Sequence, residues 1–410
     1  MPIDVRRITD AESRVPIQET LKATNVMTTQ RILTTHAGSL PRPASLSAMH
    51  GARFRGETIN LQQLEAEIET ATQNIVAKQI ASGVDLINDG EMGRESFFTY
   101  VQHQMTGFGG RASRKLMRDM TMYPTFLASL MRSTGTTEVS LLTPPQAIGD
   151  VRYKNTQTVD AECARLARLL RAHGREPRSA FVTAPSPGII AAAMENKHYA
   201  SMSDYIDALA IALRNEYLAI HNAGFTLQID APDLAMERHT LFGDKPLNDF
   251  LDFARLVIAA IIRATAGIPR ERWRLHVCWG NYNGPHECDV ALADVWPVIA
   301  LADPGALLIS LANPRHEHEV ALFRNGVLPA NTKLVAGVID TTTNYVEHPE
   351  VVAQRIERAV VAVGDPARVL AGTDCGFETS AGFPMVAEEV VWAKLRALRD
   401  GAALASQRLF

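Results

Sequence analysis

Hydrophobic positions along the chain alternate between two patterns. Short aliphatic and β-branched runs, such as 226–230 and 368–373, have the length of buried strands. Between them lie longer stretches, such as 61–83, in which apolar residues recur about every 3.6 positions, as in amphipathic helices. Parallel strands covered on both faces read as nearly continuous apolar runs. We therefore predict parallel strands at 31–36, 84–89, 180–185, 226–230, 274–278, 307–311, 334–340 and 368–373.

Eight strands, each followed by helical sequence, predict a (β/α)8 TIM barrel. A doubly wound open sheet is the alternative, but no G-x-G-x-x-G fingerprint follows the first strand. The stretch 100–178 is too long for one unit, so we predict an inserted subdomain or hairpin after the second unit, covering the barrel mouth. Residues 1–28 are polar and aperiodic and are predicted to form a flexible N-terminal arm, which leaves 29–405 as a single barrel.

Composition narrows the class of protein. The net charge of −4 provides no polybasic surface for nucleic acid or membrane, and no apolar run approaches the roughly 20 residues of a membrane span. The first residues lack the apolar core of a secretory signal. The four cysteines are too few and too dispersed for a disulfide framework. We predict a cytoplasmic protein, open to homo-oligomer formation, whose cysteines bind metal or do chemistry.

Polar side chains follow most of the predicted strands. In a barrel of this type the carboxyl ends of the strands form one rim, and that rim carries the active site. One such end is ordinary, but this many together predict a catalytic rim. The groups in question are His36, Ser39 and Arg42; Asp89, Glu91 and Arg94; Asp230 and Asp233; His276 and Cys278; Asp340 and Asn344; and Asp374 and Cys375.

A metal site is the chemistry that these residues favour. Alternate residues of a strand point to the same face, so His276 and Cys278 present imidazole and thiolate together. Cys375, after the last strand, supplies a second thiolate. Three protein ligands with an open fourth position are typical of catalytic Zn²⁺.

Two other segments compete with this set, and a lone histidine or cysteine at a strand end is more often structural. His286 and Cys288 form a second His-x-Cys pair, but they lie in a loop after Gly-Pro, where the side chains need not converge. The segment 315–319, "RHEHE", also looks metal-binding, although it fits the start of a helix with acidic groups near its positive end.

The motifs "TTHAGSLPRP", "DGE", "QID", "H-x-C", "NPRHEHE" and "GTDCGF", in this order, resemble a known family. That family is the catalytic barrel of cobalamin-independent methionine synthase, with single-barrel relatives that include epoxyalkane:coenzyme M transferase. The resemblance implies a (β/α)8 barrel with zinc at the strand ends, where a substrate thiol is activated for alkyl transfer. It matches His276, Cys278 and Cys375 to the zinc ligands, Ser39 to the turn that holds an amino-acid substrate, and Glu91 and Asp230 to the carboxylates that hold its amino group.

The sequence departs from the family at two positions. The family has a glutamate as fourth zinc ligand where this chain reads "LLISLANPR", which places Ser310 or Ala312 there, so Glu317 or water would have to substitute. The family also has a histidine, linked to protonation of the leaving folate, where this chain has Thr342. The thiol, the alkyl donor and the fourth ligand therefore stay open.

We predict a zinc-dependent transferase that moves a methyl or other alkyl group from a small-molecule donor to a small-molecule thiol. His36, Glu91 or Asp340 would move a proton to the leaving atom, and Arg42 and Asn344 would join Ser39, Glu91 and Asp230 in binding substrate. One alternative is ring opening of an epoxide by a thiolate, as in epoxyalkane:coenzyme M transferase. Alternatives of a different class are a zinc hydrolase or lyase, or a non-catalytic barrel that binds a small molecule.

Overall fold

The structure is a computed structural model that describes residues 31–134 and 138–410. The predicted N-terminal arm, residues 1–28, lies outside the described residues. No helix in the described part of the chain is both long enough and apolar enough to cross a membrane.

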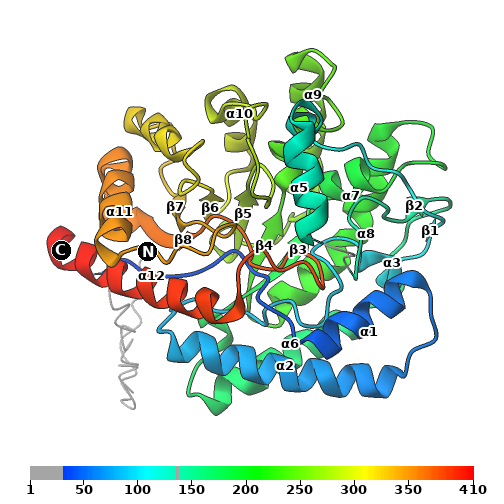
Figure 1. Cartoon of the computed structure of the whole chain (residues 1–410), viewed down its shortest axis with the longest axis horizontal. Helices are drawn as coiled ribbons and strands as arrows, with labels where there is room; N and C mark the ends of the chain where they lie inside the picture. The colour runs from blue at the N-terminus through cyan, green and yellow to red at the C-terminus, as the bar shows by residue number, and fades with distance from the viewer. Residues whose placement is uncertain (1–30, 135–137) are drawn as a thin grey trace, which may run out of the picture.

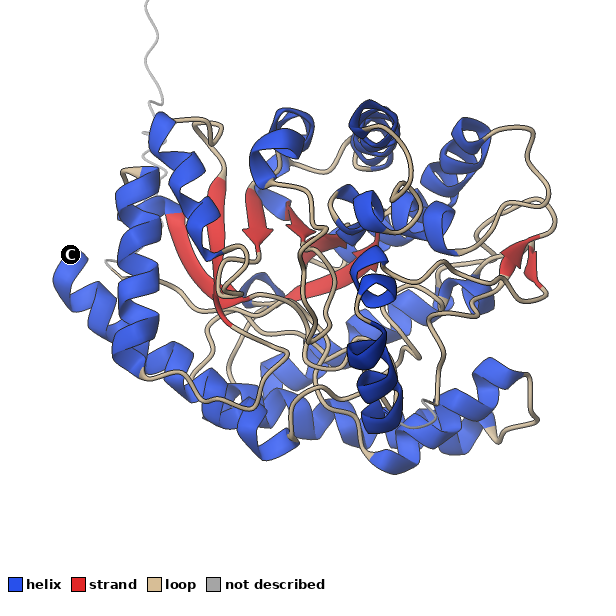
Figure 2. Ribbon diagram, turned by 45° about the horizontal axis from the view of Figure 1, so that its top comes forward, coloured by secondary structure: helices blue, strands red, loops and turns tan. Residues whose placement is uncertain are grey.

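A parallel sheet forms the centre of the molecule, and helices surround it (Figures 1 and 2). Six strands lie in the order in which they occur along the chain, and each neighbouring pair is parallel. They are β3 (Phe181–Pro185), β4 (Thr226–Asp230), β5 (Trp273–Val277), β6 (Ala306–Ile309), β7 (Lys333–Ile339) and β8 (Val369–Thr373). The α/β class and six of the predicted strands are thus confirmed, with ends that differ by two residues at most.

Helices fill most of the connections between the strands. They bury their apolar faces against the sheet, as the predicted periodicity requires. Their bounds are α1 (Ala44–Arg55), α2 (Leu61–Ala81), α6 (Gln157–Ala172), α7 (Pro187–Ala193), α8 (Met202–Asn222), α9 (Leu247–Ala264), α10 (Leu292–Ile299), α11 (Pro349–Val363) and α12 (Glu388–Leu409). Short 3-10 turns are η1 (Pro177–Ser179), η2 (Pro232–Leu234), η3 (Met236–His239), η4 (Arg270–Arg272), η5 (Ala300–Ala302), η6 (Glu317–Asn325) and η7 (Pro366–Arg368).

The first two predicted strands, 31–36 and 84–89, are not regular strands. Each makes one isolated parallel bridge, Thr34 with Ala371 of β8 and Ile87 with Ala180 just before β3. The backbone N–H of Leu86 also donates to the carbonyl of Thr34 at 3.0 Å. A side chain replaces one of the backbone hydrogen bonds that a regular strand would make here, because the Asp85 carboxylate accepts from the N–H of Thr34 at 2.8 Å. The two segments therefore pair with both outer strands of the sheet without becoming strands.

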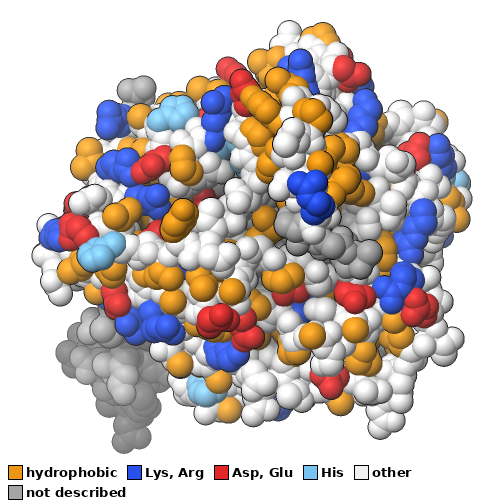
Figure 3. Space-filling view, in the orientation of Figure 1, with side chains coloured by type: hydrophobic (Ala, Val, Ile, Leu, Met, Phe, Trp, Pro, Cys, Tyr) orange, Lys and Arg blue, Asp and Glu red, His pale blue; other side chains and the backbone are white. Residues whose placement is uncertain are grey.

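The segment 100–178 combines irregular loops with several short elements and one longer helix. It contains α3 (Val101–Gln104), α4 (Arg118–Met122), α5 (Pro124–Thr134), the helix α6 and the two-stranded antiparallel sheet of β1 (Phe108–Gly109) and β2 (Gln146–Ala147). Helix α5 crosses in front of the loops at one end of the parallel sheet (Figures 1 and 2). In Figure 3 hydrophobic side chains gather over this helix, where Met131 and the nearby Met122 are exposed.

Register at the carboxyl ends of the strands positions the candidate site. Pro185 of β3 is opposite Asp230 of β4, which is opposite His276 of β5. In a parallel sheet, residues paired in this way project to the same face. The sheet thus brings Asp230 and His276 together, as the prediction of a polar rim requires.

Candidate metal centre and cavity

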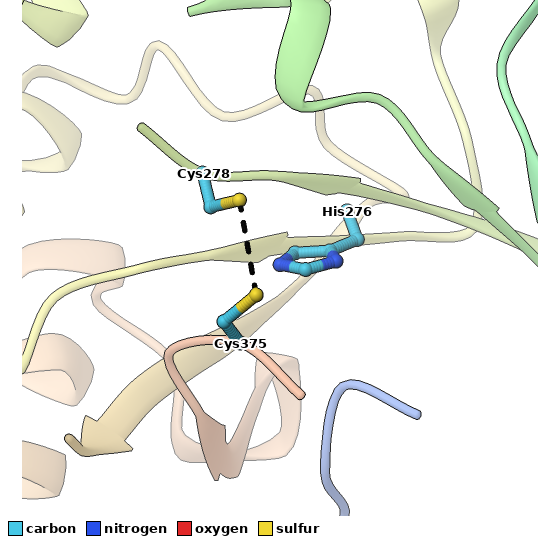
Figure 4. A group of neighbouring side chains, drawn as sticks. All are labelled: His276, Cys278 and Cys375. Carbon is cyan, nitrogen blue, oxygen red and sulfur yellow. Dashed lines mark hydrogen bonds between the residues drawn. The ribbon is translucent and has the colours of Figure 1, made fainter. Parts of the chain in front are cut away.

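Three predicted ligands meet at the carboxyl end of the sheet (Figure 4). His276 is the fourth residue of β5, Cys278 follows that strand, and Cys375 follows β8. One ligand atom from each lies within 4.8 Å of the others, and all three side chains are buried. The structure therefore brings together the set of residues that the sequence predicted as metal ligands.

The spacing of the sulfur atoms suits a zinc ion. Tetrahedral zinc with Zn–S bonds of about 2.3 Å holds two thiolates roughly 3.8 Å apart. The Sγ atoms of Cys278 and Cys375 are 4.0 Å apart (Figure 4). Two thiolates and an imidazole also form the donor set of known catalytic zinc sites. The residues present therefore fit Zn²⁺ in both geometry and chemistry.

The imidazole of His276 is oriented by a carboxylate. Its Nδ1 lies 2.9 Å from Oδ1 of Asp230, which leaves Nε2 on the side of the cysteines, 3.2 Å from the carbonyl oxygen of Asp374. A carboxylate behind the imidazole is the usual second partner of a zinc-binding histidine. Gln228 donates to the same Asp230 oxygen at 2.7 Å, so the carboxylate is itself held in place.

The cysteine pair has an uneven distribution of charge. The hydrogen bond with Cys375 and the contact with His276 hold the pKa of Cys278 well below its usual range. The same pairing, together with burial, raises the pKa of Cys375 well above it. Burial lowers the pKa of His276, but the hydrogen bond with Asp230 and the contact with Cys278 outweigh it and raise that pKa to about 10. The centre is thus built to hold negative charge on sulfur, which a bound cation requires.

A cavity of about 510 Å³ opens beside these ligands. Its polar wall includes Ser39, Glu91 and Asp230, together with His276 and both cysteines. The opposite wall is apolar and comes mainly from the segment 100–178, with Met117, Met120, Leu127, Met131, Leu141 and Leu142. Such a cavity, apolar with a few convergent polar groups, is the usual form of a small-molecule site.

Glu91 is the most perturbed carboxylate of the cavity wall. Its Oε1 accepts a hydrogen bond from Thr183 at 3.0 Å, while its Oε2 is buried without a partner. Burial, and next the negative charge of Asp230, raise the pKa of Glu91 to about 7. Its backbone has a positive φ of 61°, which is rare for a residue other than glycine. A buried acceptor in a strained turn is typical of a ligand-binding position.

Four of the predicted catalytic or substrate-binding residues are not in the wall of this cavity, and three of them are held by contacts elsewhere. His36 is buried, with Nε2 2.7 Å from Gln79, and burial lowers its pKa to about 4. The guanidinium of Arg42 donates to the backbone carbonyls of Glu378 and Glu91 at 2.6 and 3.1 Å. Asn344 is exposed and accepts from the N–H of Ala387, next to the start of α12. The predicted roles of these three residues stay predictions, and in this structure each side chain has a hydrogen-bond partner within the protein.

Asp340 lies on a neighbouring, smaller cavity. Its carboxylate accepts from Thr342 Oγ1 at 2.8 Å and from Thr343 Oγ1, within its own loop. The small cavity, about 20 Å³, is lined by Asp340 and also by Cys375, so Asp340 approaches the centre from the other side.

Ser310 and Ala312, the two positions where the family's glutamate was expected, make different contacts. Ser310 donates its hydroxyl to the carbonyl of Asp374 at 2.7 Å, and the same carbonyl contacts Nε2 of His276. Ala312 instead uses its backbone N–H, which donates to Asp374 Oδ1 at 2.9 Å. Glu317, at the start of η6, is ion-paired with Arg355 and Arg358 of α11. In this conformation its carboxylate is therefore engaged away from the candidate metal ligands.

Sequence reasoning missed the role of several residues in this region. Asp374 accepts backbone N–H groups of Leu311, Ala312 and Asn313 and so fixes the turn beside the centre. The rival pair His286 and Cys288 does not converge: Cys288 contacts Met122, whereas His286 joins Asp289 and His316 in a second group. The i,i+3 spacing of His286 and Asp289 was the available signal.

The fold and the site define a class, namely α/β proteins with a candidate His-Cys-Cys metal site at the carboxyl end of a parallel sheet. Residues 32–403 match the family model described as "Cobalamin-independent synthase, Catalytic domain". The chain belongs to this family.

Relatives and solved structures agree with this assignment. A methionine synthase of Thermococcus kodakarensis is 25% identical over 342 residues, covering 83% of this chain and 85% of that protein. A 5-methyltetrahydropteroyltriglutamate–homocysteine methyltransferase of Corynebacterium glutamicum is 26% identical over 92% of this chain, which spans only 44% of that longer relative. The chain also resembles the structure of a B12-independent methionine synthase from Shewanella sp. W3-18-1 in complex with selenomethionine, with a TM-score of 0.70 and 21% sequence identity. The match covers 92% of this chain and 99% of that one, and it supports the fold.

Proposed function

We propose that this protein transfers a methyl or other alkyl group to the sulfur of a small-molecule thiol, with Zn²⁺ held by His276, Cys278 and Cys375. The observation that carries the proposal is the convergence of these three buried side chains, backed by Asp230, on a cavity large enough for small substrates. The free cysteines of the chain, Cys163, Cys278, Cys288 and Cys375, suit a reducing, cytoplasmic setting.

Zinc bound to such a set lowers the pKa of a thiol and so supplies a thiolate nucleophile near neutral pH. The thiol sulfur then gains a bond to carbon while the bond from that carbon to its leaving atom breaks. The proton of the thiol goes to solvent or to the leaving atom. Glu91 is suited to carry it, because a buried carboxyl with a pKa of about 7 both accepts and donates protons near neutrality.

Glu91 and Asp230 also favour an amino-acid thiol as acceptor. Both line the cavity, and the Oε2 of Glu91 has no protein partner. A substrate ammonium group would satisfy this oxygen and offset the burial of the carboxylate. Ser39 lies on the same wall, in the turn that carries Gly38 with a φ of 136°. Homocysteine, the acceptor named for the Corynebacterium glutamicum relative, has this chemistry.

The apolar wall favours a compact donor and so supports the epoxide-opening alternative. Among the described residues that line the cavity, Arg114 is the one arginine or lysine, and its guanidinium is ion-paired with Glu237. A triglutamate donor carries several carboxylates that would need cationic partners. Methionine and leucine side chains instead suit a small alkyl donor or a strained ring.

We further propose that the sheet closes into a (β/α)8 barrel spanning 29–405, with 100–178 as an insertion over its mouth. The bridges of Thr34 and Ile87 link the two outer strands of the sheet through the first two predicted strands. Interior contacts support closure, since Arg274 of β5 donates to Thr35 Oγ1 at 3.1 Å and to the His36 carbonyl at 2.9 Å.

Paired cysteine substitutions test the function. Purified full-length protein is assayed for zinc content and, by mass spectrometry, for alkylation of homocysteine and simple thiols by methylated folate, small methyl donors and epoxides. We expect Cys375→Ala to lose the zinc and the alkylated product. Cys288→Ala is the matched control, because Cys288 contacts Met122 rather than the centre, and it should retain both. Product formation that persists in Cys375→Ala would refute the proposal, and a hydrolysed ester in place of an alkylated thiol would favour the zinc hydrolase.

A further inference from the structure

We propose that His286, Asp289 and His316 form a second metal site in this chain, for a divalent transition-metal ion. The three residues come from two loops, one after β5 and one after β6. Their ligand atoms lie within 4.8 Å of one another. This group shares no residue with the cysteine-containing centre. The proposal of a second metal site does not depend on the proposed alkyl transfer.

Asp289 contacts both histidines of this group. Its Oδ2 lies 2.7 Å from Nδ1 of His286 and 2.7 Å from Nε2 of His316. Neighbouring ligands of an octahedral ion with bonds of about 2.1 Å are roughly 3.0 Å apart, so a small outward shift admits a cation. The three side chains are exposed by only 4%, 1% and 3% in sequence order, so bulk solvent does not reach them.

The hydrogen-bond partners of the two histidines are the main argument. A neutral imidazole has one nitrogen that donates and one that accepts. His286 faces Asp289 on one side and, at 3.1 Å, the carbonyl oxygen of Tyr282 on the other, and both partners can only accept. His316 faces Asp289 and, at 3.4 Å, the carboxylate of Glu319, which already accepts from the N–H of Leu292.

A cation between the three residues resolves this mismatch. Each histidine would turn an unprotonated nitrogen to the ion and donate its other N–H outward, His286 to the Tyr282 carbonyl and His316 to Glu319. This is the usual arrangement of metal-binding histidines, in which the second nitrogen donates to a carbonyl or carboxylate. Without a cation, all four ring nitrogens find a partner only if both imidazoles are fully protonated, with Asp289 shared between them and Glu319 beside His316.

A third histidine strengthens the case. His239 is buried to 1% exposure, and neither of its ring nitrogens has a hydrogen-bond partner. Its Nε2 lies 3.5 Å from Oδ1 of Asp289, an oxygen that is itself buried and unpaired. Unpaired buried polar atoms are costly, and several around one carboxylate indicate a missing partner. His239 faces the other carboxylate oxygen of Asp289 and lies outside the group of three ligand atoms.

The donor set indicates the kind of ion and its role. Two imidazoles with one carboxylate suit Zn²⁺, Fe²⁺ or Co²⁺ rather than Ca²⁺ or Mg²⁺. The burial of all ligands favours a structural site over an open catalytic one. An ion here would tie the loop 279–291 to the loop after β6, and the former begins directly after Cys278. The ring of His316 stacks on Trp279 at 3.7 Å, which extends this link toward the cysteine centre.

Cobalt binding to the full-length chain tests the proposal, because Co²⁺ reports its ligands. Thiolate ligands give an intense charge-transfer band in the near ultraviolet, whereas nitrogen and oxygen ligands give only weak visible bands. We expect chelator-stripped protein to bind two equivalents of Co²⁺, of which one lacks the charge-transfer band. A Cys278→Ser, Cys375→Ser variant should retain that second equivalent, and binding should raise its Tm by several degrees.

Asp289→Asn is the decisive substitution, because asparagine keeps the shape of the side chain but loses the charge. Added to the cysteine variant, it should abolish the remaining cobalt binding. His318→Ala is the matched control, since His318 is exposed two residues from His316, and it should leave the binding intact. The proposal is overturned if wild-type protein binds cobalt only with the charge-transfer band. That result would point to a cluster of protonated histidines. Binding that survives Asp289→Asn would also overturn the proposal, because it would place the second ion at another site.

Discussion

Replacing Glu91 with glutamine should stabilise the protein at alkaline pH. Burial first, and then Asp230, raise the pKa of Glu91 from its ordinary value of 4.5 to about 7. The folded state therefore holds the proton more tightly than the unfolded state does. The stability gained from this proton is complete below about pH 4.5 and is lost as the pH rises through 7. Above pH 7 the wild-type protein keeps a charged carboxylate in a buried place, and the Glu91→Gln substitution removes that cost.

The magnitude follows from the two pKa values. A rise of the pKa from 4.5 to about 7 corresponds to about 3 kcal/mol at pH 8 and about 1 kcal/mol at pH 5. Unfolding entropy of about 2.1 cal/mol/K per residue amounts to about 0.9 kcal/mol/K for a chain of this size. The Tm of Glu91→Gln should thus exceed that of the wild type by about 4 °C at pH 8 and by about 1 °C at pH 5.

Thermal unfolding of both proteins between pH 5 and 8, without added substrate, measures this difference. Glu95→Gln is the matched control, a nearby buried carboxyl with the opposite shift. Burial raises its pKa, but hydrogen bonds from His103 at 2.7 Å and Gln102 outweigh this and lower it. Because that charge stabilises the folded state above the ordinary pKa, Glu95→Gln should lower the Tm, and more at pH 8 than at pH 5.

A Tm of Glu91→Gln that equals or falls below the wild-type value at pH 8 would refute this reasoning. It would mean that water or a counter-ion in the cavity solvates Glu91, so that the unpaired Oε2 is not available as an empty acceptor for a substrate ammonium group.

Three further substitutions test the metal centre and its surroundings. Asp230→Asn removes the carboxylate behind His276 and should weaken zinc binding about 10- to 100-fold in a chelator competition, whereas unchanged affinity would remove Asp230 from the centre. Ser310→Glu restores the family's carboxylate and should tighten zinc binding in the same competition; weaker binding would show that the turn cannot present it. Arg42→Met leaves Glu378 buried without its cation and should cost about 3 kcal/mol of stability. The KM for the thiol should not change. A raised KM would show that Arg42 takes part in substrate binding.

The parallel sheet was predictable because burial on both faces leaves a strong local signal. The six strands from β3 to β8 are short apolar runs between helix-length periodic segments, and their positions needed no long-range information. The two segments near Thr34 and Ile87 have the same apolar pattern but form only single bridges. The difference arises from Asp85, whose carboxylate accepts the hydrogen bond from the N–H of Thr34 in place of a backbone carbonyl. A hydrophobic pattern does not reveal that a side chain will replace a backbone partner.

Residues of the candidate site could be predicted where their position follows from the end of a strand. They could not be predicted where their role depends on distant hydrogen-bond partners. His276 and Cys278 are fixed by alternation on one strand, and Cys375 follows from the end of another. His36 and Arg42 have equally suitable chemistry and a similar place in the sequence. Their side chains are committed to Gln79 and to the carbonyls of Glu378 and Glu91, which are 43 to 336 residues away. Residue type indicates what a side chain can do, whereas tertiary contacts decide whether it is free to do it.

The serine at position 310 makes electrostatic sense in this particular site. Two thiolates already balance a divalent ion, and Asp230 and Glu91 lie on the same wall. A carboxylate at 310 would add a further negative charge in a buried region, and like charges raise one another's pKa. With serine, the hydroxyl donates to the Asp374 carbonyl and adds no charge, so Glu91 keeps a pKa near neutrality. In the proposed metal centre, serine at position 310 therefore limits the negative charge around the ligands.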